Sequence, residues 1–222
     1  MRTDVRYRVE VTGAEIRLLV LAHTAVGCTG IDLASGAFVR AVHPATDEPL
    51  RTLDVVSAEI GEPLDPPEFA QPEAVQLASP PRKVGNLGIR RAERYLQAVQ
   101  HPPQSPLLGF SGPAVPYWTR AGDRPSLSVL TAEVGPQVRW AASGFECRFS
   151  WQGQLHQLPL GDDALEATLR RLERPRCSGR ELARLLGYRP RRLLVVLTPP
   201  IDGYCFKQVA ALLPGGRHAG KT

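Results

Sequence analysis

The chain has 222 residues, enough for one large domain or two small ones around a buried core. Hydrophobic residues make up 43% and charged residues 22%, ordinary values that exclude a disordered or fibrous chain. The 27 lysines and arginines outnumber the 22 aspartates and glutamates, and the resulting net charge of +5 favours an anionic partner such as nucleic acid.

Apolar runs near the start of the chain predict a small antiparallel sheet. Residues 15–23 and 53–60 have the length and composition of strands. Between them, residues 30–42 predict a hairpin, because two short apolar runs flank a turn that contains glycine. On the return strand of this hairpin, Arg40 is expected on the same face as Phe38.

The middle of the chain is poorer in strand signals. Residues 61–87 are expected to hold at most one short strand, at 74–77. Residues 88–100 predict a helix, because apolar side chains recur at helical spacing until a pair of prolines ends the pattern. Residues 101–124 are rich in proline and glycine and predict a connecting segment.

The second half predicts a further block of short strands, at residues 126–134, 137–140, 144–151, 154–159, 192–198 and 204–213. Two helices interrupt this block. Asp163 is expected to cap the first helix, with Glu166 as its capping-box partner, and Ser178 is expected to cap the second.

The two blocks share a pattern of short antiparallel strands with added helices. They predict a mostly β fold with added helices (β+α), in which two small antiparallel barrels lie side by side. The expected division is a first barrel at 1–100, the connecting segment at 101–124, a second barrel at 125–214 and a flexible tail at 215–222.

Two short motifs resemble those of the bacterial dual OB-fold domain family. The first lies in the predicted hairpin and comprises Cys28, Gly30, Gly36, Phe38, Val39 and Arg40. The second lies in the last predicted strand and comprises Gly203, Tyr204, Lys207, Val209 and Ala210. The resemblance spans the chain from end to end and implies two OB-like barrels with a nucleic-acid or nucleotide ligand.

Positive charge is concentrated in residues 170–192, which hold nine arginines and only two glutamates. Arg180 and Arg184 are one helical turn apart, on the face opposite the leucines of the predicted helix, so both are expected to face solvent. Two interpretations stay open: a surface that follows a phosphate backbone, or an ordinary solvated helix face.

An OB-like barrel that binds single strands combines cations with aromatic rings on which bases stack. Core packing is the alternative role for each aromatic, and Tyr204 and Lys207 are expected on opposite faces of their strand. Trp118 beside Arg120 and Trp140 beside Arg139 form further candidate pairs. The candidate nucleic-acid-binding residues are Arg40, Arg120, Arg176, Arg180, Arg184, Arg191, Arg192, Tyr204 and Lys207.

Other functional motifs are weak. The last eight residues, GGRHAGKT, match the phosphate-loop pattern G-x-x-x-x-G-K-[ST], but such a loop needs a following helix and the sequence stops at Thr222. We therefore expect a mobile basic tail there. The histidines and cysteines show no metal-ligand spacing, and no nucleophile or acid–base motif appears, so no metal, no cofactor and no catalytic residue is predicted.

The four cysteines are scattered, which predicts reduced thiols in the cytoplasm, and the longest apolar runs are too short for a membrane helix. The leading hypothesis is a non-catalytic module that binds single-stranded DNA or RNA. One alternative is an accessory subunit that docks a protein partner in a bacterial defence or nucleic-acid-processing complex. Another is a sensor of a nucleotide-like small molecule, bound between the two barrels.

Overall fold

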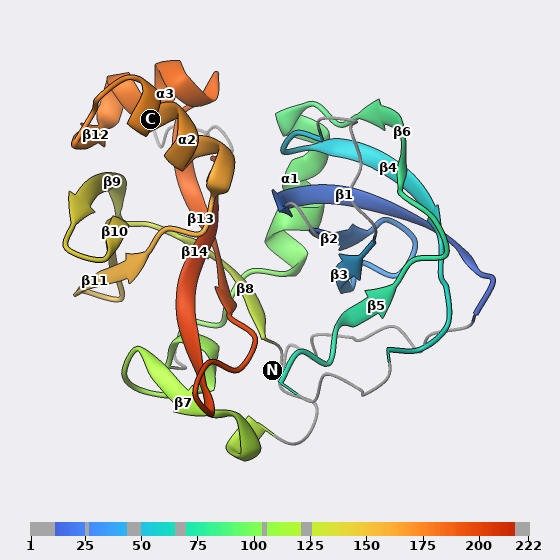
Figure 1. Cartoon of the computed structure of the whole chain (residues 1–222). Helices are drawn as coiled ribbons and strands as arrows, with labels where there is room; N and C mark the ends of the chain where they lie inside the picture. The colour runs from blue at the N-terminus through green and yellow to red at the C-terminus, as the bar shows by residue number, and fades with distance from the viewer. Residues whose placement is uncertain are drawn as a thin grey trace.

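Apolar runs of the first half form the strands of one curved sheet. The structure, a computed structural model, describes residues 12–24, 27–43, 50–64, 70–103, 106–120 and 126–215. Its first-half strands are β1 (Glu15–Thr24), β2 (Gly27–Asp32), β3 (Phe38–Val42), β4 (Asp54–Glu59), β5 (Ala74–Gln76) and β6 (Arg82–Asn86). They lie in the order β5-β3-β2-β1-β4-β6 (Figure 1).

The first-half sheet curls into a half-barrel. The first residues of β1 pair with β4 and its last residues pair with β2, so that one long strand contributes to two sides of the curve. β3 and β5 pair in parallel, and an isolated bridge between Ile60 and Leu77 brings the ends of β4 and β5 together. The strands and the hairpin predicted for this region are confirmed.

β6 corrects the prediction that residues 61–87 hold at most one strand, because β5 and β6 both lie there. All five residues of β6 are exposed, so the strand lacks the alternation of apolar and polar side chains that marks a half-buried strand. It is held by pairing with β4 and by an ion pair of 2.8 Å between Lys83 Nζ and Asp54 Oδ2.

The second half contains two four-stranded sheets, in the orders β11-β10-β9-β12 and β7-β14-β13-β8. Its strands are β7 (Ala114–Pro116), β8 (Leu127–Thr131), β9 (Val134–Ala141), β10 (Gly144–Trp151), β11 (Gln154–Pro159), β12 (Arg176–Ser178), β13 (Pro190–Leu197) and β14 (Tyr204–Pro214). β10 and β11 match the strands predicted at 144–151 and 154–159, and they pair as an antiparallel hairpin. Gln152 and Gly153 both have positive φ there, as a two-residue hairpin turn requires.

The order of strand pairing in the first half recurs in the second. β8 and β9 together take the place of β1: β8 pairs with β13, and β9 pairs with β10. β11 leads to a parallel bridge between Leu160 and Val209 of β14, which corresponds to the parallel pair of β3 and β5. The two halves therefore share a connectivity that their amino-acid sequences show only as a pattern.

Three α-helices occur among the described residues: α1 (Ile89–Ala98), α2 (Asp163–Arg171) and α3 (Gly179–Leu186). All three were predicted, but the cap of α2 is corrected. Asp162, and not Asp163, is the N-cap residue, because its Oδ1 accepts a hydrogen bond of 3.0 Å from Leu165 N–H. The side chain of Ser178, which precedes α3, makes no capping hydrogen bond.

The predicted connecting segment contributes a strand to the second half. Its described part holds the 3₁₀ turns η1 (Leu107–Gly109) and η2 (Tyr117–Arg120), and β7 lies between them. β7 pairs with the first residues of β14 and forms the edge of that sheet. The tail predicted at 215–222 lies outside the described residues from residue 216 onward.

The two halves share a hydrophobic core. Leu19, Phe38 and Leu96 of the first half belong to one buried cluster with Val129 and Leu194 of the second. α1 contributes Ala92 and Leu96 to this cluster and lies between the two halves (Figure 1). The mostly β fold with added helices is confirmed. No described helix combines the length and the apolar composition that crossing a bilayer requires.

Candidate nucleic-acid interface

Arg40 lies at the boundary between the halves and is engaged there. Its Nε is 3.4 Å from Oε1 of Glu73, a side chain that is fully buried. Its Nη2 donates to Ser126 Oγ at 3.2 Å and to the Leu197 carbonyl at 3.3 Å, both in the second half. Ser126 in turn donates its hydroxyl to Glu73. Arg40 therefore fixes the two halves to each other, and we do not place it on a binding surface.

Arg192 is 7% exposed and has a comparable role. From β13 it reaches Glu93 of α1 through two hydrogen bonds, of 2.8 Å from Nη1 and 2.5 Å from Nη2. Two parallel contacts between guanidinium and carboxylate are the strongest arrangement of this pair. The charge of Arg192 is thus neutralised inside the protein.

Lys207 is 5% exposed and points inward from β14. Its Nζ donates to the Phe110 carbonyl at 2.8 Å and lies 3.9 Å from the centroid of the Phe110 ring. Burial lowers the pKa of Lys207 to about 8. Tyr204 on the same strand is exposed, so the two residues lie on opposite faces, as predicted.

The arginines of residues 170–192 divide into paired and unpaired groups. Besides Arg192, Arg170 pairs with Glu166 at 3.2 Å and stacks over Trp140, and Arg174 pairs with Glu181 at 3.1 Å. Among the described residues no carboxylate pairs with the remaining arginines of this segment, which are Arg171, Arg176, Arg180, Arg184, Arg189 and Arg191. Of these, Arg180 and Arg184 are exposed on α3, and Arg191 is half-buried. The side chain of Arg120 lies outside the described part.

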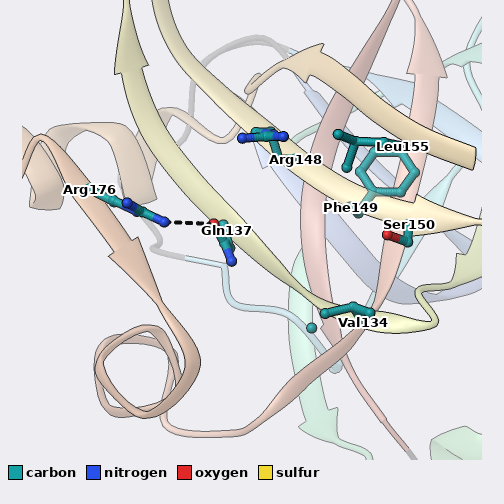
Figure 2. Close-up of a pocket in the computed structure, with 8 residues that line it drawn as sticks. Val134, Gln137, Arg148, Phe149, Ser150, Leu155 and Arg176 are labelled. Carbon is teal, nitrogen blue, oxygen red and sulfur yellow. Dashed lines mark hydrogen bonds between the residues drawn. The ribbon is translucent and has the colours of Figure 1, made fainter.

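A groove of about 320 Å³ lies on the outer face of the sheet β11-β10-β9-β12 (Figure 2). Arg148 of β10 and Arg176 of β12 supply its cations. Its remaining side chains include the polar Gln137 and Ser150 and the apolar Val134 and Leu155. Val134 and Leu155 are 60% and 62% exposed, so apolar surface lies open beside the charges.

Strand alternation explains why the groove is polar. The odd residues of β10, Phe145 to Trp151, are buried in the core, and the even residues lie on the outer face. The ladder aligns Arg148 with Gln137 of β9, and Arg139 of β9 with Arg176 of β12. Three arginines from three neighbouring strands therefore share one face of the sheet.

These three arginines differ in how far they are engaged. Arg139 donates to Gln157 at 2.8 Å and lies 3.5 Å from Glu146, so it is partly neutralised. Arg176 donates only to the neutral side chain of Gln137, at 3.2 Å, as the dashed line in Figure 2 marks. Arg148 pairs with no carboxylate in the described part of the chain, and its buried Nε lacks a hydrogen-bond partner there.

The sequence interpretation missed Arg148. Its signal is present, because Glu146, Arg148 and Ser150 alternate with Phe145, Cys147 and Phe149 in "GFECRFSW". The prediction relied instead on the concentration of arginines in residues 170–192. Of the predicted residues, only Arg176 lines this groove. The helix α3, which carries Arg180 and Arg184, contacts β9 and β12, and its Leu182 is buried with Val138 and Cys177, which lie on the core face of these strands.

A second surface feature is an aromatic patch around the start of β14, which we define as Tyr117, Trp118, Ile201, Tyr204 and Phe206. The pairing of β7 with β14 brings Trp118 and Tyr204 together, with their ring centroids 6.2 Å apart. Trp118 is 60% exposed. The patch lies near β7, at the end of β14 opposite the helices α2 and α3 (Figure 1).

The described residues hold no group of three histidine, cysteine or acidic side chains placed to bind a metal ion. All four cysteines are buried. Burial raises the pKa of Cys28 and of Cys147 to about 12, so both thiols are protonated at neutral pH.

No protein-family model, curated protein sequence or solved structure matches the chain.

Proposed function

We propose that the protein binds single-stranded nucleic acid on the outer face of β9, β10, β11 and β12. The observation that carries this proposal is the pair Arg148 and Arg176, which line one groove without a carboxylate partner among the described residues. Guanidinium groups match phosphate geometry and are weakly hydrated, so they suit a nucleic-acid backbone.

The strand order supports an OB-type barrel as the scaffold. An OB-fold is a five-stranded, partly open barrel that binds oligonucleotides across its second and third strands. In the second half, with β8 and β9 taken together as the first strand, β10 and β11 occupy those positions. The half-barrel of the first half has the same connectivity, so we propose two OB-like barrels, in line with the resemblance noted from sequence.

The side chains that line the groove indicate how a single nucleic-acid strand is bound. Arg148 and Arg176 contact phosphates. Val134 and Leu155 offer apolar contact to bases, and Gln137 and Ser150 offer hydrogen bonds. Because most of these contacts are to the backbone or are apolar, binding is tolerant of base sequence.

Fluorescence anisotropy of a labelled oligonucleotide tests the proposal. We expect saturable binding of a single strand at low salt, stronger than binding of the matching duplex, and weakening steeply as salt rises. The absence of binding at low salt, or binding that is indifferent to salt, would contradict it.

The aromatic patch favours a second candidate function, docking of a protein partner. Its five large side chains are 37% to 60% exposed and lie together, and such patches mark interaction sites on soluble proteins. Under this function, a partner co-purifies from the native host after nuclease treatment, and the Trp118→Ala/Tyr204→Ala variant fails to retain it. Retention of the same partner by that variant would exclude the patch.

A further inference from the structure

A cleft of about 950 Å³ lies between the two halves, on a surface separate from the sheet groove. One wall is the first part of α1, and the other is the turn between α3 and β13 together with the end of β14. Arg90 and Arg91 line it from α1, and Arg189 lines it from the opposite wall. All three arginines are exposed.

The cleft carries an uncompensated positive charge. Its one acidic lining residue is Glu93, whose carboxylate is held by Arg192 through two hydrogen bonds. Among the described residues, no carboxylate pairs with Arg90, Arg91 or Arg189. The three exposed arginines therefore line a shared concave site whose positive charge is not balanced by carboxylates of the described residues.

Without a bound anion, the position of Arg90 and Arg91 lowers the stability of helix α1. Both lie in the first turn of α1, which has no acidic residue and no side-chain cap. Cations near the start of a helix are unfavourable because that end of the helix carries partial positive charge. A local rule broken without an internal compensation points to a functional role.

The uncharged wall of the cleft is also defined. The Tyr188 hydroxyl donates to the Leu212 carbonyl at 2.7 Å, which fixes the ring at the rim. A tyrosine is uncharged at neutral pH, and burial raises the pKa of Tyr188 further, to about 12, so this side chain adds no negative charge beside the arginines. Ile89, 37% exposed, adds apolar surface on the other wall.

We propose that this cleft binds the polyphosphate group of a small phosphorylated ligand through Arg90, Arg91 and Arg189. Three arginines from two elements line this one cleft, and planar guanidinium groups match phosphates, each of which accepts paired hydrogen bonds. Tyr188 and Ile89 lie where a base attached to that chain finds an apolar surface. The site is independent of the sheet groove, and it joins the two halves through a ligand.

Isothermal titration calorimetry with inorganic triphosphate and with the four ribonucleoside triphosphates, without Mg²⁺, tests this site. We expect triphosphate to bind the full chain and the Arg91→Gln/Arg189→Gln variant to bind it at least tenfold more weakly. The matched control is Arg17→Gln/Arg82→Gln, which removes two exposed arginines from the outer face of the first-half sheet. Circular dichroism checks that both variants are folded.

Comparing inorganic triphosphate with the nucleoside triphosphates identifies which kind of phosphorylated ligand the cleft prefers. Tighter binding of a nucleoside triphosphate than of triphosphate assigns the ligand as a nucleotide, and equal binding assigns an inorganic polyphosphate. No binding to the wild-type chain, or equal binding by the cleft variant and the control, overturns the proposal.

The oligonucleotide assay keeps this test apart from the proposed function. Arg148→Gln/Arg176→Gln is expected to keep triphosphate binding, and Arg91→Gln/Arg189→Gln is expected to keep oligonucleotide binding. Loss of oligonucleotide binding in the cleft variant would overturn the assignment of a separate small-ligand site.

Discussion

Arg192 of β13 and Glu93 of α1 are 99 positions apart in the sequence, yet they form a two-point ion pair across the boundary between the two halves. Arg40 and Glu73 form a second ion pair at this boundary. Two of the arginines that sequence alone offers as nucleic-acid contacts thus hold the molecule together. The binding surface that we propose is made by Arg148 and Arg176, which the sheet places on its outer face.

Removing the carboxylate of the first pair is expected to destabilise the protein strongly. Glu93→Gln leaves the guanidinium of Arg192 buried without a counter-charge, and we expect the free energy of unfolding to fall by about 3 kcal/mol. Urea denaturation measures this change. Glu166→Gln, which breaks the more exposed pair with Arg170, is the control and is expected to cost about 0.5 kcal/mol or less. Equal effects of the two substitutions would refute the assembling role of Glu93.

The cap of α2 gives a second pair of matched variants. Asp162→Ala removes the side chain that accepts the Leu165 N–H, and we expect a loss of about 1 kcal/mol in the free energy of unfolding. Asp163→Ala removes only a charge from the first turn, and we expect a loss of about 0.5 kcal/mol. Thermal unfolding monitored by circular dichroism distinguishes them. A larger loss at Asp163 would restore the cap predicted from sequence.

How well an element could be predicted depends on how much of it is buried. β10 matches its prediction at both ends, because its buried and outer residues alternate without interruption. β6 has no buried residue and β12 has only three residues, so neither leaves a hydrophobic pattern in the sequence. Local patterns define strands with several buried residues, and they miss strands that are fully exposed or very short, such as β6 and β12.

The candidate site could be predicted only in part, for a different reason. Whether an arginine is free depends on carboxylates that are distant in sequence. Arg192 and Arg176 belong to the same arginine-rich segment, but only Arg192 meets a glutamate, and that glutamate comes from α1. Strand register, which the sequence does not reveal, places Arg148 and Arg176 on one face.

Lys207 is expected to make stability depend on pH in a narrow window. Its pKa is about 8 in the folded protein, against 10.5 for an ordinary lysine, because burial disfavours the charged form. Between these values the unfolded chain binds more protons at this lysine than the folded one, so the contribution of Lys207 to the free energy of unfolding rises with pH, by about 1 kcal/mol from pH 8 to pH 9. Below pH 8 both states are protonated and the burial penalty is fully present.

From about pH 8 upward the buried cysteines oppose this rise, and from pH 8 to pH 9 their combined effect is also about 1 kcal/mol. Cys28, Cys147 and Cys177 keep their protons in the folded state to a pKa of about 12, 12 and 11, whereas an exposed thiol loses its proton near 9.0. The free energy of unfolding is therefore expected to fall above pH 9. Urea titrations from pH 7.5 to 10 measure the free energy of unfolding across the range in which the lysine and the cysteines both contribute. Lys207→Met is predicted to remove the lysine contribution, so that the free energy of unfolding of the wild type, relative to this variant, rises by about 1 kcal/mol from pH 8 to pH 9. A difference that does not change with pH would contradict the assignment.

Truncation of Trp151 and of Trp118 is expected to have very different effects on the free energy of unfolding. Trp151 is 7% exposed and packs edge-on against His101, so Trp151→Ala is expected to cost about 3–5 kcal/mol. Trp118 is 60% exposed, and Trp118→Ala is expected to change the free energy of unfolding by about 0.5 kcal/mol or less. A large destabilisation by Trp118→Ala, measured in urea, would show that the aromatic patch is structural and not available for a partner.

The salt dependence of single-strand binding tests the account most directly. Each phosphate contact contributes about 0.7 to the slope of log K against log salt for a single strand, so Arg148→Gln/Arg176→Gln is predicted to flatten the slope by about 1.4 and to weaken binding at every salt concentration. The Arg17→Gln/Arg82→Gln control removes the same charge from the first-half sheet and is predicted to keep the wild-type slope. An unchanged slope in the groove variant, or an equal loss in the control, would contradict the placement of nucleic acid on the outer face of β9–β12.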